Sequence, residues 1–177
     1  YDVNSSCSDE VSFNISINST IDINVVANQT VCDSYALPVI TGTNLSGAEA
    51  YYTGSGGTGT SYSAGDIIYS SVTPMYIYDV AGSCSDEVSF NIEINNTPVI
   101  DNPGDQVSCG DYILPVITGS NLTGSEAYFT GTNGTGTSYN TGDVISGDML
   151  LYIYDVSGSC SDDVSFYVTI NSTIDID

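Results

Sequence analysis

One seven-residue segment recurs three times and constrains the fold more than any other feature. It begins at Cys7, Cys84 and Cys160 and reads Cys-Ser-Asp, then Asp or Glu, then Val-Ser-Phe. The starts are 84 − 7 = 77 and 160 − 84 = 76 residues apart. A second segment, Leu-Pro-Val-Ile-Thr-Gly, begins at Leu37 and returns at Leu114. Self-similarity at a fixed period predicts a tandem array of small units that fold alike.

The period divides the chain into two whole repeats and two partial ones. The first residues, Tyr1-Asp2-Val3, match Tyr78-Asp79-Val80 inside a repeat, so we expect the natural polypeptide to be longer at both ends. The expected divisions are the C-terminal hairpin remnant of a preceding repeat at 1–20, the first repeat at 21–97, the second at 98–173 and the start of the next at 174–177.

Strict alternation of apolar and polar residues follows the second cysteine of each repeat. Its apolar members are Val88, Phe90, Ile92 and Ile94, with the same series at Val11, Phe13, Ile15 and Ile17 and at Val164, Phe166, Val168 and Ile170. A period of two predicts a strand with one buried face. The segments 75–79 and 151–155 precede it across a Gly-Ser turn, which predicts an antiparallel hairpin with the second cysteine near its tip.

Shorter strands are predicted upstream of this hairpin. In the first repeat they cover 29–33, 35–40, 49–53 and 66–69, and the glycine-rich tract 54–60 is expected to be a hairpin loop. The tract lacks the lysine and the helix of a phosphate-binding loop. About six or seven short strands in about 77 residues predict an all-β fold, built of tandem small immunoglobulin-like β-sandwich repeats with one disulfide each.

The five cysteines occupy two positions in the repeat. Cys32 and Cys109 lie near its start, and Cys7, Cys84 and Cys160 lie near its end. A zinc site normally needs four clustered ligands, and the chain has no histidine to supply one. We therefore expect the disulfides Cys32–Cys84 and Cys109–Cys160, with Cys7 bonded to an upstream partner outside the chain. A closed loop of about 50 residues would stabilise each repeat by roughly 4 kcal/mol and indicates an oxidising compartment.

The charge of the chain is entirely negative. It has 22 acidic residues, no Lys, Arg or His, and a net charge of −22. Internal salt bridges between side chains cannot form, so each carboxylate must be met by water, backbone N–H groups or cations from solution. The charge excludes nucleic acid and anionic membranes as direct electrostatic partners, and the sequence has no apolar run long enough for membrane insertion.

The absence of bases also limits catalysis. No His or Lys can activate a nucleophile, and paired carboxylates remain the one catalytic option. The pairs Asp9-Glu10, Asp86-Glu87 and Asp162-Asp163 recur at one position of every repeat. Adjacent strand residues also point to opposite faces, so we predict no enzyme activity, no catalytic residues and no required cofactor. Calcium is the alternative to a solvated acidic surface. The candidate calcium ligands are Asp79, Asp86, Glu87, Asp155, Asp162 and Asp163 at the hairpin ends, and Asp22 and Asp101 at the repeat junctions.

Two aromatic pairs raise a further alternative, carbohydrate binding. Tyr51-Tyr52 and Tyr128-Phe129 lie on predicted strands, so one member of each pair should face outward. Tyr52 and Phe129 are the candidate glycan contacts, and packing on the sheet surface is the alternative role for both.

The order of the motifs resembles a known group of surface proteins. Cys-x-x-Tyr-x-Leu-Pro-x-Ile-Thr-Gly-x-Asn-Leu-(Ser/Thr)-Gly is followed by Glu-Ala-Tyr-(Tyr/Phe)-Thr, Gly-Thr-Gly-Thr-Ser-Tyr and Tyr-Ile-Tyr-Asp. This order is similar to repeats in the large SprB-like gliding-motility adhesins of Bacteroidota (flavobacteria), which the type IX secretion system exports. The resemblance covers Cys32–Ile94 and Cys109–Ile170 and the partial repeat before them, and it implies an extracellular filament on the bacterial cell surface.

Together these features predict a structural stalk of a giant cell-surface adhesin, which projects an adhesive region for attachment or gliding. The expected partners are extracellular surfaces or polysaccharide, and neighbouring repeats of the same polypeptide. The alternatives are a multivalent polysaccharide-binding module, which gains affinity from repeated weak sites, and the spacer of a secreted enzyme.

Overall fold

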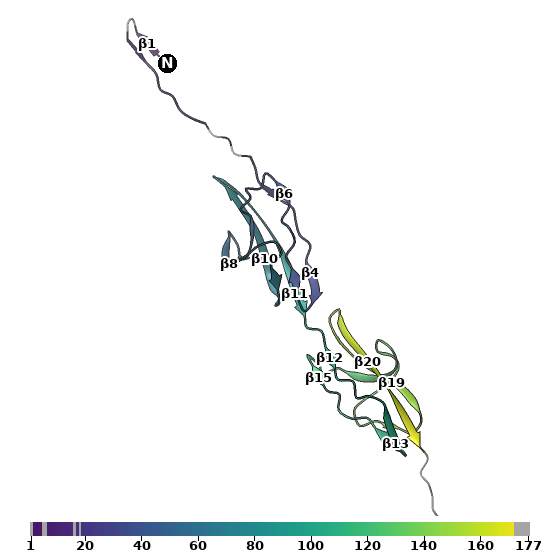
Figure 1. Ribbon diagram of the computed structural model, residues 1–177. Coiled ribbons are helices and arrows are strands. Elements are labelled where there is room, and N and C mark those ends of the chain that lie inside the picture. The colour runs from purple at the N-terminus through teal and green to yellow at the C-terminus, as the bar shows by residue number, and fades with distance from the viewer. Residues whose placement is uncertain (1, 5–6, 16, 18, 172–177) are drawn as a thin grey trace, which may run out of the picture. The chain divides into compact units, whose positions relative to one another are not determined.

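The computed structural model describes all residues except 1, 5–6, 16, 18 and 172–177, and every regular element in that part of the chain is a β-strand (Figure 1). Strands β3 to β11 and strands β12 to β20 follow each other in the same order. The two predicted repeats therefore have matching secondary structure, and the prediction of an all-β chain is confirmed.

The strands before and within the first repeat are mostly short, with one long hairpin. Their bounds are β1 Asp2–Asn4, β2 Cys7–Asp9, β3 Asp22–Ile23, β4 Gln29–Cys32, β5 Tyr35–Ala36, β6 Gly42–Thr43, β7 Ala50–Gly54, β8 Thr58–Tyr62, β9 Ile67–Ile68, β10 Val72–Ala81 and β11 Cys84–Asn95.

The second repeat has the same pattern. Its strands are β12 Val99–Ile100, β13 Gln106–Cys109, β14 Tyr112–Ile113, β15 Gly119–Ser120, β16 Ala127–Gly131, β17 Thr135–Tyr139, β18 Val144–Ile145, β19 Met149–Ser157 and β20 Cys160–Asn171.

The chain forms two compact units, and the first repeat contributes to both. One unit comprises Tyr1–Val26, Pro38–Ala64 and Pro74–Ser89, and the other comprises Ala27–Leu37, Gly65–Thr73 and Phe90–Asp177. The second repeat lies wholly in the second unit. The division of the chain at residues 20, 97 and 173 stays a prediction about the sequence repeat.

The second repeat is a two-layer sandwich. One layer is a five-stranded sheet in the order β13-β20-β19-β16-β17, and the other consists of the pairs β12–β15 and β14–β18. Strands β19 and β20 form the long antiparallel hairpin, with Leu151 opposite Phe166 and Ser157 opposite Cys160. The first repeat has the corresponding sheet order, β4-β11-β10-β7-β8, and the corresponding pairs β3–β6 and β5–β9.

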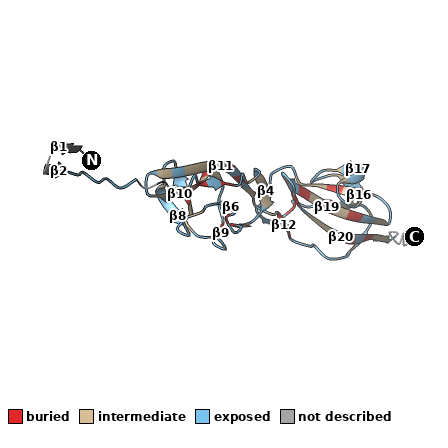
Figure 2. Cartoon of the chain, turned by 90° about the horizontal axis from the view of Figure 1, so that it is seen from above, coloured by how far each residue is buried: buried red, intermediate tan, exposed pale blue. Residues whose placement is uncertain are grey.

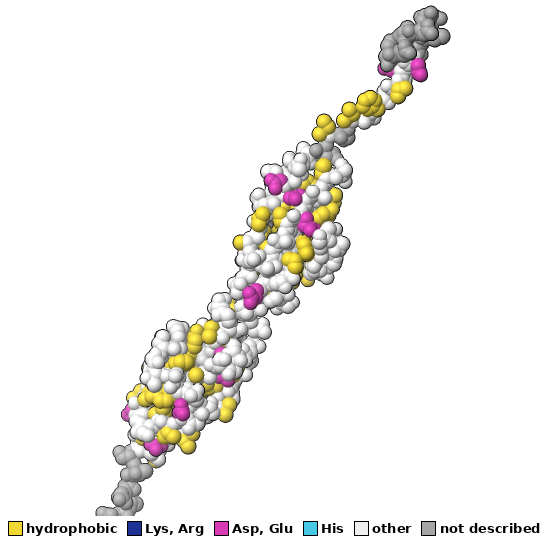
Figure 3. All heavy atoms as spheres, turned by 180° about the vertical axis from the view of Figure 1, so that it is seen from behind, with side chains coloured by type: hydrophobic (Ala, Val, Ile, Leu, Met, Phe, Trp, Pro, Cys, Tyr) yellow, Lys and Arg dark blue, Asp and Glu magenta, His cyan; other side chains and the backbone are white. Residues whose placement is uncertain are grey.

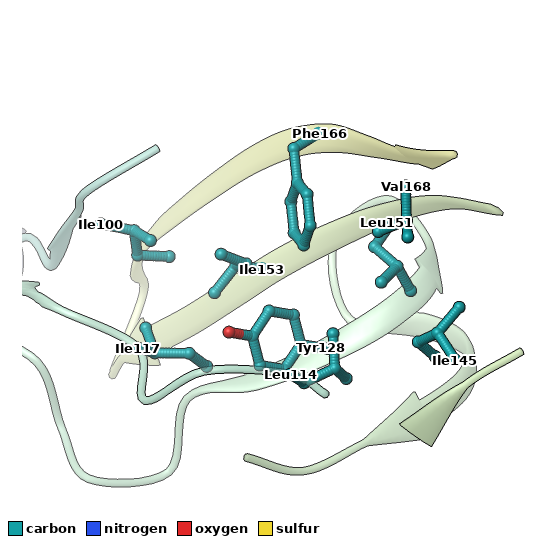
Figure 4. Close-up of a cluster of buried hydrophobic side chains, with 9 residues drawn as sticks. All are labelled: Ile100, Leu114, Ile117, Tyr128, Ile145, Leu151, Ile153, Phe166 and Val168. Carbon is teal, nitrogen blue, oxygen red and sulfur yellow. The ribbon is translucent and has the colours of Figure 1, made fainter. Parts of the chain in front are cut away.

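The core lies between these layers and uses the alternation seen in the sequence. Buried and partly exposed residues alternate along β19 and β20, as Figure 2 shows by colour. Tyr128 and Phe166 meet edge to face, with ring centroids 6.0 Å apart. The Tyr128 hydroxyl donates a hydrogen bond to the Pro115 carbonyl at 2.9 Å, which satisfies its polar end inside an apolar layer. The cluster in Figure 4 comprises Ile100, Leu114, Ile117, Tyr128, Ile145, Leu151, Ile153, Phe166 and Val168.

The first edge strand of each sheet runs parallel to its neighbour, which alternation alone does not predict. Strand β4 pairs with β11 so that Cys32 lies opposite Asn95, and β13 pairs with β20 so that Cys109 lies opposite Asn171. The pairs β1–β2, β3–β6, β5–β9, β7–β8, β7–β10, β12–β15, β14–β18, β16–β17, β16–β19 and β19–β20 are antiparallel.

Two local predictions are wrong. The glycine-rich tract 54–60 is not all loop, because β8 begins at Thr58 and pairs with β7. The alternating residues Val11, Phe13 and Ile15 lie outside any strand and are 75–82% exposed. A strand needs a neighbour for its backbone and a second layer for its apolar face, and the described chain supplies neither to residues 10–15. Residues 16 and 18 lie outside the described part.

Candidate functional site

Each long hairpin carries one fully buried carboxylate. Asp79 is 1% exposed and Asp155 is 2% exposed, although neighbours two residues away on the same strands are apolar core residues. Asp79 accepts a hydrogen bond from the Ser46 backbone N–H at 2.7 Å, another from the Ser46 hydroxyl, and a third from its neighbour Val80 N–H at 2.8 Å. Asp155 repeats these bonds with Thr123 and Val156.

These bonds keep Asp79 ionised. Burial by itself would raise the pKa of this carboxyl group, but the hydrogen bonds from Ser46 and Val80 outweigh it and lower the pKa below the ordinary 3.8. The charge is thus stabilised by N–H and O–H dipoles, in a chain whose side chains offer no cation. Asp79 thereby fixes the loop that follows β6 to the middle of the sheet.

The acids at the hairpin tips have the same kind of role. Asp86 accepts the backbone N–H of Ile23 at 2.7 Å, and Asp162 accepts that of Ile100 at the same distance. Each bond ties the short first strand of a repeat to its hairpin. Glu87 accepts the Ser55 hydroxyl at 2.7 Å and the Gly56 N–H, and Asp163 accepts the Asn133 N–H. The recurring carboxylates therefore anchor loops and strand ends through backbone donors.

The structure separates the candidate calcium ligands into these individual contacts. No group of three or more Asp, Glu or Cys side chains converges on one point among the described residues. Asp22 lies on β3 and Asp101 follows β12, each exposed. The calcium sites remain a prediction, to be tested in solution. In Figure 3 the acidic side chains are dispersed over the visible face, with no basic side chain among them.

The candidate glycan contacts lie on the outer face of each sheet. Tyr51 and Tyr128 are buried, whereas Tyr52 and Phe129 are partly exposed. Tyr52 packs edge to face against Tyr78 at 6.4 Å between ring centroids, and Phe129 packs in the same way against Tyr154 at 6.3 Å. The outward orientation of one member of each pair is confirmed, while glycan binding by it stays a prediction.

The glycine-rich turn covers the second ring of this outer pair. A methyl group at Gly57 would lie 2.8 Å from the Tyr78 ring, and one at Gly134 would lie 2.8 Å from the Tyr154 ring. Both glycines also have a positive φ, near 70°. Glycine is required here by close approach as well as by backbone conformation.

The disulfide pairing differs from the pairing predicted from the sequence. Cys32 is bonded to Cys160, a separation of 128 residues with the Cα atoms 5.7 Å apart, and Cys84 and Cys109 are free. The predicted pairs Cys32–Cys84 and Cys109–Cys160 are therefore wrong. The bond joins the first cysteine of one repeat to the second cysteine of the next. The side chain of Cys7 lies outside the described residues.

The parallel edge strand explains why the predicted pairs cannot form. Cys32 ends β4 beside Asn95 at the end of β11, whereas Cys84 begins β11. The offset is 95 − 84 = 11 residues, which spans about 36 Å along an extended strand. A disulfide allows Cα atoms at most about 7 Å apart. Cys109 and Cys160 are separated in the same way along β20.

Several contacts surround the bond at the junction between the repeats. Asp33, the residue after Cys32, donates its N–H to the Asn95 carbonyl at 2.9 Å. Its carboxylate accepts the Thr97 N–H at 2.8 Å and the Thr97 hydroxyl at 2.7 Å, and these two bonds lower the pKa of Asp33. The Asn95 side chain abuts Gly158, where an added methyl group would lie 2.5 Å from the Asn95 amide nitrogen. The hairpin tip of the second repeat thus packs against the residues that leave the first.

No pocket is found in the described part of the chain, and none of its elements is a helix able to cross a bilayer. The carboxylate pairs considered for catalysis, Asp86-Glu87 and Asp162-Asp163, accept hydrogen bonds at separate places in each sandwich.

Comparison with known proteins gives the fold. No protein family matches the sequence, and no curated protein matches it. Extracellular domains 3–5 of Drosophila OTK superpose with a TM-score of 0.52 at 7% identity, covering 86% of this chain and 62% of that one. The insect immune protein hemolin, described with implications for homophilic adhesion, gives a TM-score of 0.49 at 12% identity, over 95% of this chain and 54% of that one. The chain thus spans less than two thirds of either protein, and the likeness to OTK shows an immunoglobulin-like fold.

Proposed function

We propose that this chain is a load-bearing segment of an extracellular adhesion protein. The observation that carries the proposal is the Cys32–Cys160 bond, which makes two consecutive sandwiches covalently continuous in addition to the polypeptide itself. The bond limits the extension of the 128 residues between Cys32 and Cys160, a property that suits a spacer under tension. The disulfide also fits a compartment outside the reducing cytoplasm.

The surface of the segment suits a spacer. All of its charge has one sign, which opposes collapse of neighbouring repeats and association with nucleic acid. The absence of Lys and Arg leaves no cleavage site for trypsin-like proteases outside the cell. The likeness to OTK supports the fold only, and the adhesive role is inferred from the repeat and the bond.

The more specific form of the proposal follows the motif resemblance. We infer a stalk in a large SprB-like adhesin on a bacterial cell surface, exported by the type IX system and serving attachment or gliding. The test is immunolabelling of intact cells that carry the gene, with antibody against this chain, followed by deletion of the repeats in frame. Surface labelling with attachment reduced in proportion to the repeats removed is expected. Labelling only after lysis, or attachment unchanged by the deletion, would overturn the proposal.

Polysaccharide binding is the competing function, because Tyr52 and Phe129 are partly exposed on equivalent outer faces. The test uses a glycan array probed with the intact chain and with a Tyr52→Ala, Phe129→Ala variant. A stalk is expected to give no binding that depends on these two rings. Binding that the double variant loses would instead assign the repeats a direct adhesive role. A catalytic domain in the flanking sequence would favour the third candidate function, the spacer of a secreted enzyme.

A further inference from the structure

The free cysteine at the end of the second repeat occupies the same position as the bonded one in the first. Cys109 ends β13 opposite Asn171, as Cys32 ends β4 opposite Asn95. The next residue, Gly110, donates its N–H to the Asn171 carbonyl at 3.1 Å, as Asp33 does to Asn95 at 2.9 Å. Cys109 is exposed. Cys109 therefore already has the backbone position that Cys32 has in the disulfide.

The other free cysteine matches the second half of the site. Cys84 begins β11 after a turn at Gly82 with φ 63°, and Cys160 begins β20 after a turn at Gly158 with φ 60°. The glycines before the two cysteines therefore share a left-handed conformation. They differ in exposure, since Cys160 is 2% exposed whereas Cys84 is partly exposed. The additional burial of Cys160 accompanies its bond to Cys32.

We propose that Cys109 and Cys84 are sites for further inter-repeat disulfides of the Cys32–Cys160 type. Cys109 bonds to the second cysteine of a repeat that follows, and Cys84 bonds to the first cysteine of a repeat that precedes. The partner is in each case another copy of this repeat on the same polypeptide. The inference extends the proposed function, since it needs more repeats than this chain holds, but it does not depend on what the protein adheres to.

The bond forms by thiol–disulfide exchange with an oxidised dithiol or a small-molecule disulfide. The Cys109 thiolate attacks one sulfur of that oxidant and releases its other sulfur as a thiolate, which leaves a mixed disulfide. The thiolate of the partner cysteine then attacks the Cys109 sulfur and displaces the remaining oxidant thiolate. Two protein thiols lose two electrons and two protons, and the oxidant disulfide is reduced to two thiols.

Successive bonds of this kind overlap along the sequence. The loop closed by Cys32–Cys160 contains Cys109, whose own bond leaves that loop for the next repeat. Any cut between residues 33 and 159 therefore leaves the array connected, and so does a cut in each following loop. In a fully bonded array, the shortest covalent path from one end to the other passes through the disulfides and through the residues from the second cysteine of one repeat to the first cysteine of the next. The residues between the first and second cysteines of each repeat are not on this path. Strands β5 to β10 and β14 to β19 are then spared end-to-end tension, whereas β11 to β13, between Cys84 and Cys109, lie on the path that carries it.

The experiment lengthens the full chain by one repeat. Asp177 occupies the position of Asp101 in the repeat, so a copy of residues 102–171 is joined after Asp177 with no residue removed. The protein is oxidised with a glutathione redox buffer, and remaining thiols are alkylated in acid. It is then digested with proteases that cleave at Asp and Glu, because trypsin has no site. Mass spectrometry before and after reduction gives the pairing.

We expect two bonded peptide pairs, Cys32 with Cys160 and Cys109 with the added counterpart of Cys160. Cys84 should remain alkylated, because its proposed partner belongs to a preceding repeat, and it serves as the internal control. A Cys109→Ser variant should lose the second pair and keep the first. Alkylated Cys109 under conditions that close Cys32–Cys160, or Cys109 bonded to Cys160 within its own repeat, would overturn the inference. Neither result depends on adhesion, so failure here and failure of the proposed function can be told apart.

Discussion

Cys32 lies beside Asn95 across the parallel pair of β4 and β11, at the opposite end of β11 from Cys84. This relationship directs the disulfide of Cys32 across the boundary between the two repeats. Had the edge strand been antiparallel, the same two cysteines could have met at one end of the sheet. The direction of one four-residue strand thus decides whether the repeats are separately or jointly cross-linked.

The first prediction concerns the loop that the disulfide closes. Single molecules held at their two termini should gain about 440 Å of contour length when the bond is reduced, since 160 − 32 = 128 residues become extensible. Cys32→Ser should give this length without reductant. It should also lower the free energy of unfolding by about 5 kcal/mol through loop-closure entropy. Cys109→Ser, at the same position of the other repeat, is the control and should change neither quantity in this chain. Equal effects of the two variants would contradict the pairing.

The second prediction concerns acid stability. Because hydrogen bonds lower the pKa of Asp79 in the folded state, this group stabilises the fold above its unfolded pKa near 3.9. That stability is lost as pH falls through the lower folded pKa. Asp79→Asn should cost about 2–4 kcal/mol at pH 7, because an amide cannot accept all three donors as well.

Urea unfolding at pH 7 and at a series of lower pH values measures this effect. The difference between the native protein and the Asp79→Asn variant should shrink as the pH falls below the unfolded pKa and through the lower folded pKa of Asp79. Glu93→Gln removes one charge from an exposed position on β11 and controls for net charge. An Asp79→Asn protein as stable as the Glu93→Gln protein at pH 7 would show that the buried bonds contribute nothing.

Most of the architecture was predictable because it rests on local signals. The alternation from Val164 to Ile170 correctly gave the last strand and its buried face, and the Gly-Ser turn before Cys160 gave the hairpin. The lack of any basic side chain left water, backbone N–H groups or cations from solution as partners of the carboxylates, and Asp86 and Asp162 accept hydrogen bonds from backbone N–H groups.

What escaped prediction depends on long-range pairing. The sequence of Gln29–Cys32 does not indicate which strand it pairs with, or whether the pairing is parallel or antiparallel. The disulfide partner of Cys32 depends on this pairing. The two-residue strand Asp22–Ile23 is too short to show a period, and it is held by Asp86, 63 residues away. The burial of Asp79 was also not predictable, because an acidic residue next to a tyrosine on a strand is expected to be exposed. It is buried because the loop that contains Ser46 packs against it.

A third prediction concerns the glycine turn over the outer tyrosine. Gly56 and Gly57 are adjacent, and both have φ of 70°, but only Gly57 faces the Tyr78 ring. Alanine at either position should cost about 1–2 kcal/mol for the left-handed backbone. Gly57→Ala should cost more than Gly56→Ala, because the Tyr78 ring must also move. Urea midpoints of the two variants measure the difference, and Gly134→Ala provides a repeat of the test against Tyr154. Equal costs for Gly56→Ala and Gly57→Ala would show that the ring contact is unimportant.

A fourth prediction tests calcium at the hairpin-end acids. A specific ion at Asp162 and Asp163 would raise the melting temperature in millimolar Ca²⁺ and lower it again with chelator, by mass action on the folded state. The variant carrying Asp162→Asn and Asp163→Asn should lose that response. An equal rise in Na⁺ of matched ionic strength would assign the effect to screening of the net charge of −22. An unchanged melting temperature in both salts would end the calcium prediction.

The last prediction concerns alkaline pH and the core tyrosine. Burial, with a smaller contribution from Tyr112, raises the pKa of Tyr128 to about 12. An unfolded tyrosine has a pKa near 10, so between pH 10 and 12 the unfolded chain loses a proton that the folded chain keeps. The free energy of unfolding must therefore fall as pH rises through this range. Tyr128→Phe should be about 1 kcal/mol less stable at pH 7, having lost the bond to Pro115, and should show a weaker decline above pH 10.

Alkylated free cysteines prevent disulfide exchange at high pH during this measurement. Tyr69→Phe, at a position 71% exposed, is the control and should decline with pH as the native protein does. If Tyr128→Phe and Tyr69→Phe gave the same slope above pH 10, the alkaline transition would have to arise elsewhere in the chain. A weaker slope for Tyr128→Phe alone would place the titration at the hydroxyl that lies between the two layers of the second sandwich.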